Sequence, residues 1–147
     1  YAPALVTADA LAYTPPSLFD GVLLDAPCSA TGTFRRHPEV IWHRDAADIA
    51  GRVALQRQML ERAAACLNPG GVLIYCVCSL EPEEGEEQAR WATSVGLEPW
   101  PVTAIELEGW TAPLTPEGFV RTHPGLTVAG EKGGTLDGFF IARFRRR

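Results

Sequence analysis

Two short apolar runs of the chain have the pattern of buried strands. Residues 19–25 read Phe-Asp-Gly-Val-Leu-Leu-Asp, and residues 72–78 read Val-Leu-Ile-Tyr-Cys-Val-Cys. Short and nearly continuous apolar runs are typical of strands that are covered on both faces of a parallel sheet. We therefore expect two such strands, the first ending in the carboxylate of Asp25 and the second in the thiol of Cys78.

Helical periodicity fills the segments that follow these strands. Between residues 45 and 67, apolar positions recur at spacings of three, four or seven residues. Asp45 is expected to cap this helix, and the Asn-Pro-Gly-Gly sequence at 68–71 is expected to end it. A second helix is predicted over 83–95, which a proline precedes and a glycine ends. The alternation of strands and helices predicts βαβ units with a parallel sheet.

The two ends of the chain have strand patterns as well. Residues 4–9 read as the last part of a strand, and the chain does not begin with methionine, so we expect a fragment of a longer protein. Residues 136–144 predict the last strand, and residues 119–124 predict its partner in an antiparallel hairpin at the edge of the sheet. The predicted fold class is thus α/β with a C-terminal antiparallel hairpin.

Composition restricts the function classes. A chain of 147 residues with 46% hydrophobic residues fits one domain with its own core. The net charge of -5 argues against a surface that binds nucleic acid over its whole extent, but it leaves room for a local basic face. No apolar run approaches the roughly 20 residues of a membrane span. No basic and apolar leader sequence opens the chain, which contains four cysteines. We expect a cytoplasmic protein with free thiols and no membrane contact.

The carboxyl ends of the two predicted strands carry the candidate chemistry. Ligands of open α/β sheets bind beyond these ends, so Asp25, Cys28 and Cys78 would meet at one edge of the sheet. A thiol beside a helix N-terminus has a lowered pKa and is a stronger nucleophile, and either cysteine could occupy such a place. A carboxylate at a buried strand end is costly unless it binds something, which favours a functional role for Asp25.

The cysteines admit two alternative roles at this point. Cys76 and Cys78 lie two residues apart on a strand, so packing on one face would account for both. A zinc site that adds Cys28 as a third ligand is the second alternative, although the chain has no Cys-x-x-Cys pair.

Basic and aromatic side chains follow the first cysteine. Residues 33–38 read Thr-Phe-Arg-Arg-His-Pro, and residues 42–44 read Trp-His-Arg. Arginine binds phosphates and aromatic rings stack on bases, as a nucleic-acid groove requires. We therefore expect a nucleic-acid-binding strip beside the first cysteine loop that consists of Arg35, Arg36, His37 and Arg44.

Three motifs resemble those of the RNA cytosine-5 methyltransferases, and most closely the bacterial small-subunit ribosomal RNA type (Sun/Fmu, NSUN-related). They are residues 25–32 (Asp-Ala-Pro-Cys-Ser-Ala-Thr-Gly), 35–38 (Arg-Arg-His-Pro) and 78–84 (Cys-Ser-Leu-Glu-Pro-Glu-Glu). The resemblance extends from Asp9 to Phe144. It implies that residues 1–147 are the C-terminal part of one S-adenosylmethionine-dependent domain. That part would be a partial Rossmann-like class I methyltransferase sheet with helices on both faces. The glycine-rich cofactor loop would lie upstream.

The resemblance also implies a reaction, the transfer of a methyl group from S-adenosylmethionine to C5 of a cytosine in RNA, expected to be 16S rRNA. Cys78 would add to C6 of the base, and Cys28 would help to release the product. Asp25 would hold the cytosine and lie near the methyl donor, and Asp9 would contact the adenine side of the cofactor. The DNA enzymes attack with a Pro-Cys in the first motif, which would instead make Cys28 the nucleophile.

The chain departs from the family pattern in three respects. Cys76 is an extra thiol beside Cys78, which leaves open which of the two attacks. Gly85 stands where the family usually has asparagine, which is expected to loosen the start of the second helix. The family's first strand lies beside the strand of residues 19–25, so that strand would have an unpaired edge here. We expect the chain to self-associate through this edge or to be part of a longer polypeptide, and to be inactive when isolated. A non-catalytic RNA-binding or scaffolding module with this fold is the alternative function.

Overall fold

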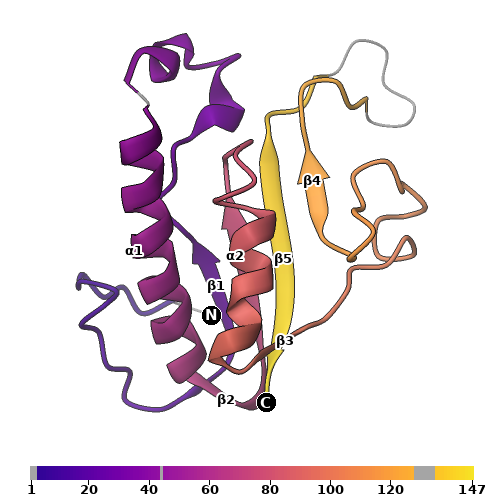
Figure 1. Ribbon diagram of the computed structural model, residues 1–147. Helices are drawn as coiled ribbons and strands as arrows, with labels where there is room; N and C mark the ends of the chain where they lie inside the picture. The colour runs from indigo at the N-terminus through magenta and orange to yellow at the C-terminus, as the bar shows by residue number, and fades with distance from the viewer. Residues whose placement is uncertain (1–2, 44, 128–134) are drawn as a thin grey trace.

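The computed structural model describes residues 3–43, 45–127 and 135–147 (Figure 1). These residues form a sheet of five strands, which are β1 (Phe19–Asp25), β2 (Leu67–Val77), β3 (Leu97–Pro99), β4 (Val120–Thr122) and β5 (Phe139–Arg146). β1 pairs with β2 in parallel, and β2 pairs with β5 in the antiparallel sense. β3 and β4 both pair with β5 along its other side, also antiparallel. The parallel pair and the C-terminal antiparallel hairpin are therefore confirmed.

The helix after β1 begins where the sequence pattern predicts, but it ends at Ala65, and residues 68–71, which were expected to end it, lie within β2. α1 (Ala46–Ala65) begins after Asp45, whose carboxylate accepts a hydrogen bond from the Asp48 N–H at 2.8 Å. This contact satisfies one of the backbone N–H groups that every helix start leaves without an intrahelical partner. α2 (Glu86–Trp91) is shorter than the helix expected over 83–95, and η3, the 3-10 turn Ala92–Val95, continues it.

The core lies between the two helices and the sheet. α1 and α2 pack on each other and cover the same face of the sheet (Figure 1). Leu73, Tyr75 and Val77 alternate along β2 towards this face and are fully buried, as are Phe140 and Phe144 of β5. The alternation fixes the register of β2 against its neighbours because a slip by one residue would expose all three side chains.

The expectation of helices on both faces of the sheet is wrong for the described residues. Leu23 of β1 faces away from the buried Leu24 and is 70% exposed. The apolar residues 22–24 thus point to both faces of the sheet. Among the described residues, helices cover only one of these faces.

The strand expected over residues 4–9 is also absent from the described part of the chain. Residues 3–9 are exposed and join no ladder there. β1 accordingly pairs only with β2 among the described strands, which leaves its other edge free, as expected. No helix in the described ranges is long and apolar enough to cross a membrane.

Candidate active site

The loops that follow β1 and β2 leave the sheet side by side. The two strands are parallel, and Asp25 at the end of β1 stands opposite Cys76 near the end of β2. The Sγ atoms of Cys28 and Cys78 come within 3.5 Å of each other, and the thiol of Cys76 lies 3.7 Å from Oδ1 of Asp25. The structure therefore brings together the carboxylate and the two thiols that the sequence placed at this edge, and adds Cys76 as a third thiol.

Asp25 itself is exposed, so the expectation that its carboxylate is buried is wrong. The strand end is buried through Leu24, which faces the helices, while Asp25 faces the opposite side. Asp25 is thus an open anionic group beside the thiols, and its oxygen accepts the hydrogen bond that the Cys76 S–H donates.

The environments of the two central thiols differ. Cys28 is 8% exposed, whereas Cys78 is only partly buried, so the negative charge is better solvated on Cys78. The hydrogen bond from the Cys28 thiol lowers the pKa of Cys78 from its ordinary value of 9.0 to about 7. The same hydrogen bond and burial raise the pKa of Cys28. Since a thiolate is the reactive form, Cys78 is the better nucleophile of the pair at neutral pH.

Cys76 is held in the protonated form. Burial, with the charge of Asp25 and the hydrogen bond to it, raises the pKa of Cys76 to about 11. A protonated thiol donates a hydrogen bond and does not attack, so the structure favours Cys78 over Cys76 as the reactive thiol.

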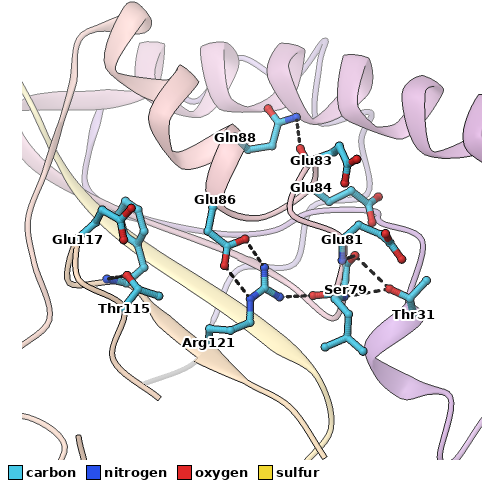
Figure 2. Close-up of polar contacts among 12 residues, drawn as sticks. Thr31, Ser79, Glu81, Glu83, Glu84, Glu86, Gln88, Thr115, Glu117 and Arg121 are labelled. Atoms are coloured by element: carbon cyan, nitrogen blue, oxygen red, sulfur yellow. Dashed lines mark hydrogen bonds and ion pairs between the residues drawn. The ribbon is translucent and has the colours of Figure 1, made fainter. Parts of the chain in front are cut away.

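Backbone contacts hold the two cysteine loops together. The N–H of Gly32 donates to the carbonyl oxygen of Cys78 at 3.1 Å, and the N–H of Leu80 donates to Oγ1 of Thr31 at 2.9 Å. Figure 2 shows Thr31 pointing at the turn that follows Cys78. Each loop therefore depends on the other for its conformation.

Glu84 is a buried residue at the centre of the site whose role the sequence reasoning missed. Its carboxylate accepts hydrogen bonds from the Ser29 N–H at 2.9 and 3.1 Å, from the Ser29 hydroxyl at 2.5 Å and from Nε2 of Gln56 at 3.1 Å. Its backbone carbonyl accepts from the Tyr75 hydroxyl at 2.6 Å. A buried carboxylate is tolerated only when it is hydrogen-bonded in this way. Its place within the second cysteine motif was the one signal in the sequence.

Two glycines allow the start of β5 to reach the first cysteine loop. The N–H of Gly138 donates to the carbonyl oxygen of Gly32 at 2.8 Å. A Cβ atom at Gly32 would lie 1.9 Å from the carbonyl oxygen of Gly138, and a Cβ atom at Gly138 would lie 2.4 Å from Cδ2 of Leu80. Only residues without a side chain fit here, so the backbones of Gly32 and Gly138 meet directly and the Leu80 side chain packs against Gly138.

The two arginines of the predicted nucleic-acid strip share one carboxylate partner, and their binding of nucleic acid stays a prediction. Arg36 pairs with Asp137 through Nε at 2.6 Å, and Nη2 of Arg35 lies 3.4 Å from the same carboxylate. Both arginines keep about half of their side chains exposed. Asp137 precedes Gly138, so the ion pairs attach the strip to the start of β5. Arg36 also holds the pKa of Asp137 below its ordinary value, and the pair is therefore ionised at neutral pH.

Two further side chains of this segment, His37 and Trp42, follow the arginines along the chain. His37 is exposed, and its Nδ1 lies 3.1 Å from Oε1 of Glu39. Trp42, in the 3-10 turn η2 (Pro38–His43), is 82% exposed, which leaves an indole ring open to solvent near the arginines. Arg44 lies outside the described residues.

The described residues offer no metal centre beside the thiols. No cluster of three or more His, Cys, Asp or Glu residues able to hold a metal ion occurs in the described part of the chain. An apolar pocket of about 190 Å³ lies between β1 and α1, lined by residues such as Leu24, Met59 and Ala63. None of its lining residues belongs to the cysteine loops, so we do not regard it as the reaction site.

Comparison with known proteins decides the family. Residues 4–145 match the family described as 16S rRNA methyltransferase RsmB/F. The chain belongs to this family. It is 43% identical over 132 residues to ribosomal RNA small subunit methyltransferase B of Pasteurella multocida, which covers 87% of this chain and 26% of that protein. The protein of the same name from Thermus thermophilus is 43% identical over 125 residues, with 85% and 29% covered. The chain thus spans just over a quarter of the length of these relatives.

Solved structures agree with the RsmB/F assignment. NSun6 from Pyrococcus horikoshii, solved with SFG, superimposes with a TM-score of 0.75 at 27% identity, over 97% of this chain and 34% of that one. A methyltransferase homolog protein from the same organism superimposes with a TM-score of 0.66 at 33% identity, over 89% and 40%. The chain is therefore a mixed α/β fragment with a partial sheet, and it matches the fold of class I methyltransferases. The resemblance to the RNA cytosine-5 methyltransferases is confirmed.

The residues present fit the methyl donor of the RsmB/F family in one place. S-adenosylmethionine carries a positively charged sulfonium, and the exposed carboxylate of Asp25 beside Cys78 is a suitable counter-charge. Asp9 lies in a turn, where its carboxylate accepts the Leu11 N–H at 2.9 Å. It makes no hydrogen bond to the cysteine loops among the described residues, so a contact of Asp9 with the cofactor stays a prediction.

Proposed function

We propose that this protein transfers a methyl group from S-adenosylmethionine to C5 of a cytosine in RNA, with 16S rRNA as the substrate, through a covalent bond between Cys78 and C6 of the base. The observation that carries the proposal is the thiol pair, whose sulfur atoms lie 3.5 Å apart, because a hydrogen bond between them lowers the pKa of Cys78 to about 7. Membership of the RsmB/F family and the similarity to methyltransferase B of two bacteria support the substrate class.

In this proposal each thiol has a separate task. C5 of cytosine is a weak nucleophile, and addition of the Cys78 thiolate to C6 makes it an enamine carbon that can attack an electrophile. After methylation, a water molecule takes the proton from C5 and the C6–S bond breaks, which returns the Cys78 thiolate and the aromatic ring. Cys28 stays protonated beside the departing sulfur and can donate to it again, so it assists release.

The cofactor supplies only the methyl group. Asp25 would face its sulfonium and the polar edge of the cytosine, because its carboxylate is exposed next to the thiols. Asp9 would contact the adenine side, as the family resemblance implies. In this proposal the chain is the C-terminal part of one catalytic domain and is inactive on its own.

The RNA would approach over the arginine strip. Arg35 and Arg36 would bind phosphates and the exposed Trp42 would stack on a base, with His37 and Arg44 as further contacts. A cytosine within a helix must leave the stack to reach Cys78. Such a reaction belongs to the cytoplasm, which fits the free thiols of the chain.

The test is the capture of the covalent intermediate. The full-length gene product is incubated with S-adenosylmethionine and unmodified small-subunit rRNA, and the adduct is resolved by denaturing electrophoresis. We expect Cys28→Ser to accumulate a protein–RNA adduct, Cys78→Ser to form none, and Cys66→Ser, a buried thiol outside the site, to behave like the parent. An adduct with Cys78→Ser alone would reverse the roles of the thiols. No adduct with either variant and no methyl transfer by the parent would favour the non-catalytic RNA-binding module.

A further inference from the structure

Arg121 of β4 lies against the turn that follows Cys78 (Figure 2). Its guanidinium donates to both carboxylate oxygens of Glu86, at 3.0 and 2.6 Å, and to the carbonyl oxygen of Ser79. The guanidinium carbon also lies 4.8 Å from the ring centre of Phe140. The side chains of Arg121 and Glu86 are only 15% and 20% exposed. One buried cation thus joins β4 and β5 to the first turn of α2 and to the residue after Cys78.

Gly85 leaves the space that this guanidinium occupies. A Cβ atom at Gly85 would lie 2.2 Å from Nη2 of Arg121 and 3.1 Å from Cγ of Phe140. The guanidinium cannot retreat without breaking its paired contact with Glu86, because a planar fork on a carboxylate has a fixed geometry. The residues at positions 85 and 121 are therefore matched to each other.

The residues on either side of Cys78 are anchored in different ways. Val77 is the last residue of β2 and is held by the sheet ladder, where it pairs with Phe140. Ser79 lies outside the sheet, and its carbonyl is held by Arg121. Loss of Arg121 would remove the charged contact that fixes the peptide after Cys78, and would leave the hydrogen bonds of Gly32 to the Cys78 carbonyl and of the Leu80 N–H to Thr31.

We propose that Arg121 is a positioning residue for Cys78, which fixes the peptide after the nucleophile and so keeps its sulfur in contact with Cys28. The consequence for catalysis rests on the function proposed above, whereas the consequence for the thiol pair does not. Displacement of a reacting group by about 1 Å lowers an enzymatic rate roughly 10²-fold. Loss of Arg121 should therefore lower kcat and leave the KM for RNA unchanged, since the guanidinium of Arg121 is engaged by Glu86, Ser79 and Phe140.

The first variant is Arg121→Lys, which keeps the charge and loses the fork. Its matched control is Arg90→Lys, because Arg90 of α2 makes an exposed ion pair with Glu117 at 3.3 Å. The readout is the rate of alkylation of Cys78 by iodoacetamide as a function of pH, followed by mass spectrometry of its peptide in the full-length gene product. We expect a midpoint of about 7 for the parent and the control, and a midpoint displaced towards 9.0 for Arg121→Lys, as Cys78 loses the donor thiol.

The second variant is Gly85→Ala, which retains Arg121 and displaces its guanidinium. It should move the alkylation midpoint in the same direction, and adding Arg121→Lys to it should move the midpoint no further. Gly85→Ala also decides the matter if Arg121→Lys does not fold. The proposal is overturned if both variants keep the parental midpoint and kcat while only their thermal stability falls.

Alkylation needs neither RNA nor methyl donor, so the two proposals fail separately. A displaced midpoint in variants of a parent that transfers no methyl group would uphold the role of Arg121 and refute the proposed reaction. If the parent transfers methyl groups and its variants keep the parental alkylation midpoint, the proposed reaction would stand and the role of Arg121 would be refuted.

Discussion

Substitution of Gly32 by alanine tests whether the backbone contact with β5 builds the site. The new Cβ would lie 1.9 Å from the carbonyl oxygen of Gly138, where ordinary contact begins at 3.4 Å, so the two backbones must separate by roughly 1.5 Å. That separation breaks the hydrogen bond from Gly138 to Gly32 at 2.8 Å and strains the one from Gly32 to Cys78 at 3.1 Å. Each hydrogen bond is worth about 1 kcal/mol and the overpacking costs about 1–3 kcal/mol. We expect Gly32→Ala to lose about 2–5 kcal/mol of unfolding free energy.

The assay is urea unfolding of the parent and the variant, followed by circular dichroism. Gly51→Ala is the matched control, because Gly51 lies within α1 and a Cβ atom there meets nothing within 4 Å. This control should gain about 0.5–1 kcal/mol, since alanine is the better helix former. If Gly32→Ala unfolds within about 0.5 kcal/mol of the parent, on the scale of a harmless surface change, then the close approach of Gly32 and Gly138 does not stabilise the site and our reasoning is wrong.

Three further predictions concern the charges of the site. Glu84→Gln would place an amide N–H opposite the N–H and hydroxyl donors of Ser29, and should lower the free energy of unfolding in urea by about 1–3 kcal/mol. The control Glu83→Gln changes an exposed side chain and should leave this free energy unchanged. Equal effects of the two variants would contradict the buried hydrogen-bond network. Cys28→Ala removes the donor that lowers the pKa of Cys78, so the alkylation midpoint of Cys78 should rise from about 7 towards 9.0; an unchanged midpoint would show that Cys28 does not stabilise the thiolate. Arg36→Gln should weaken the binding of a single-stranded RNA and reduce its salt slope by about 1; an unchanged slope would remove Arg36 from the phosphate contacts.

The sequence predicted the elements whose signals are local. The bounds of β1 follow from a continuous apolar run, and the start of α1 follows from Asp45, whose side chain caps the helix within three residues. The approach of Cys28 to Cys78 was predictable as well, because it needs only the rule that parallel strands end at the same edge of a sheet.

Other features depend on contacts that a single sequence does not encode locally. The face on which a right-handed crossover places its helix depends on whether the next strand is added to one side of the sheet or to the other. The strand order adds β2 and then β3 on the same side, so α1 and α2 lie on the same face. The roles of Glu84 and Arg121 arise from partners 55 and 42 residues away. Residues 4–9 have the composition of a strand, but a strand needs a neighbour, and the described chain provides none.

The position of β5 has a consequence for the order in which the protein matures during synthesis. This strand contains residues 139–146, yet it lies next to β2 and brings Gly138 onto the loop of the first cysteine. A nascent chain that has released both cysteines from the ribosome still lacks the segment that locks them together. We expect the acidic thiol to appear only after residue 146 has left the exit tunnel. A ribosome-bound intermediate would therefore carry Cys78 as an ordinary, less reactive thiol.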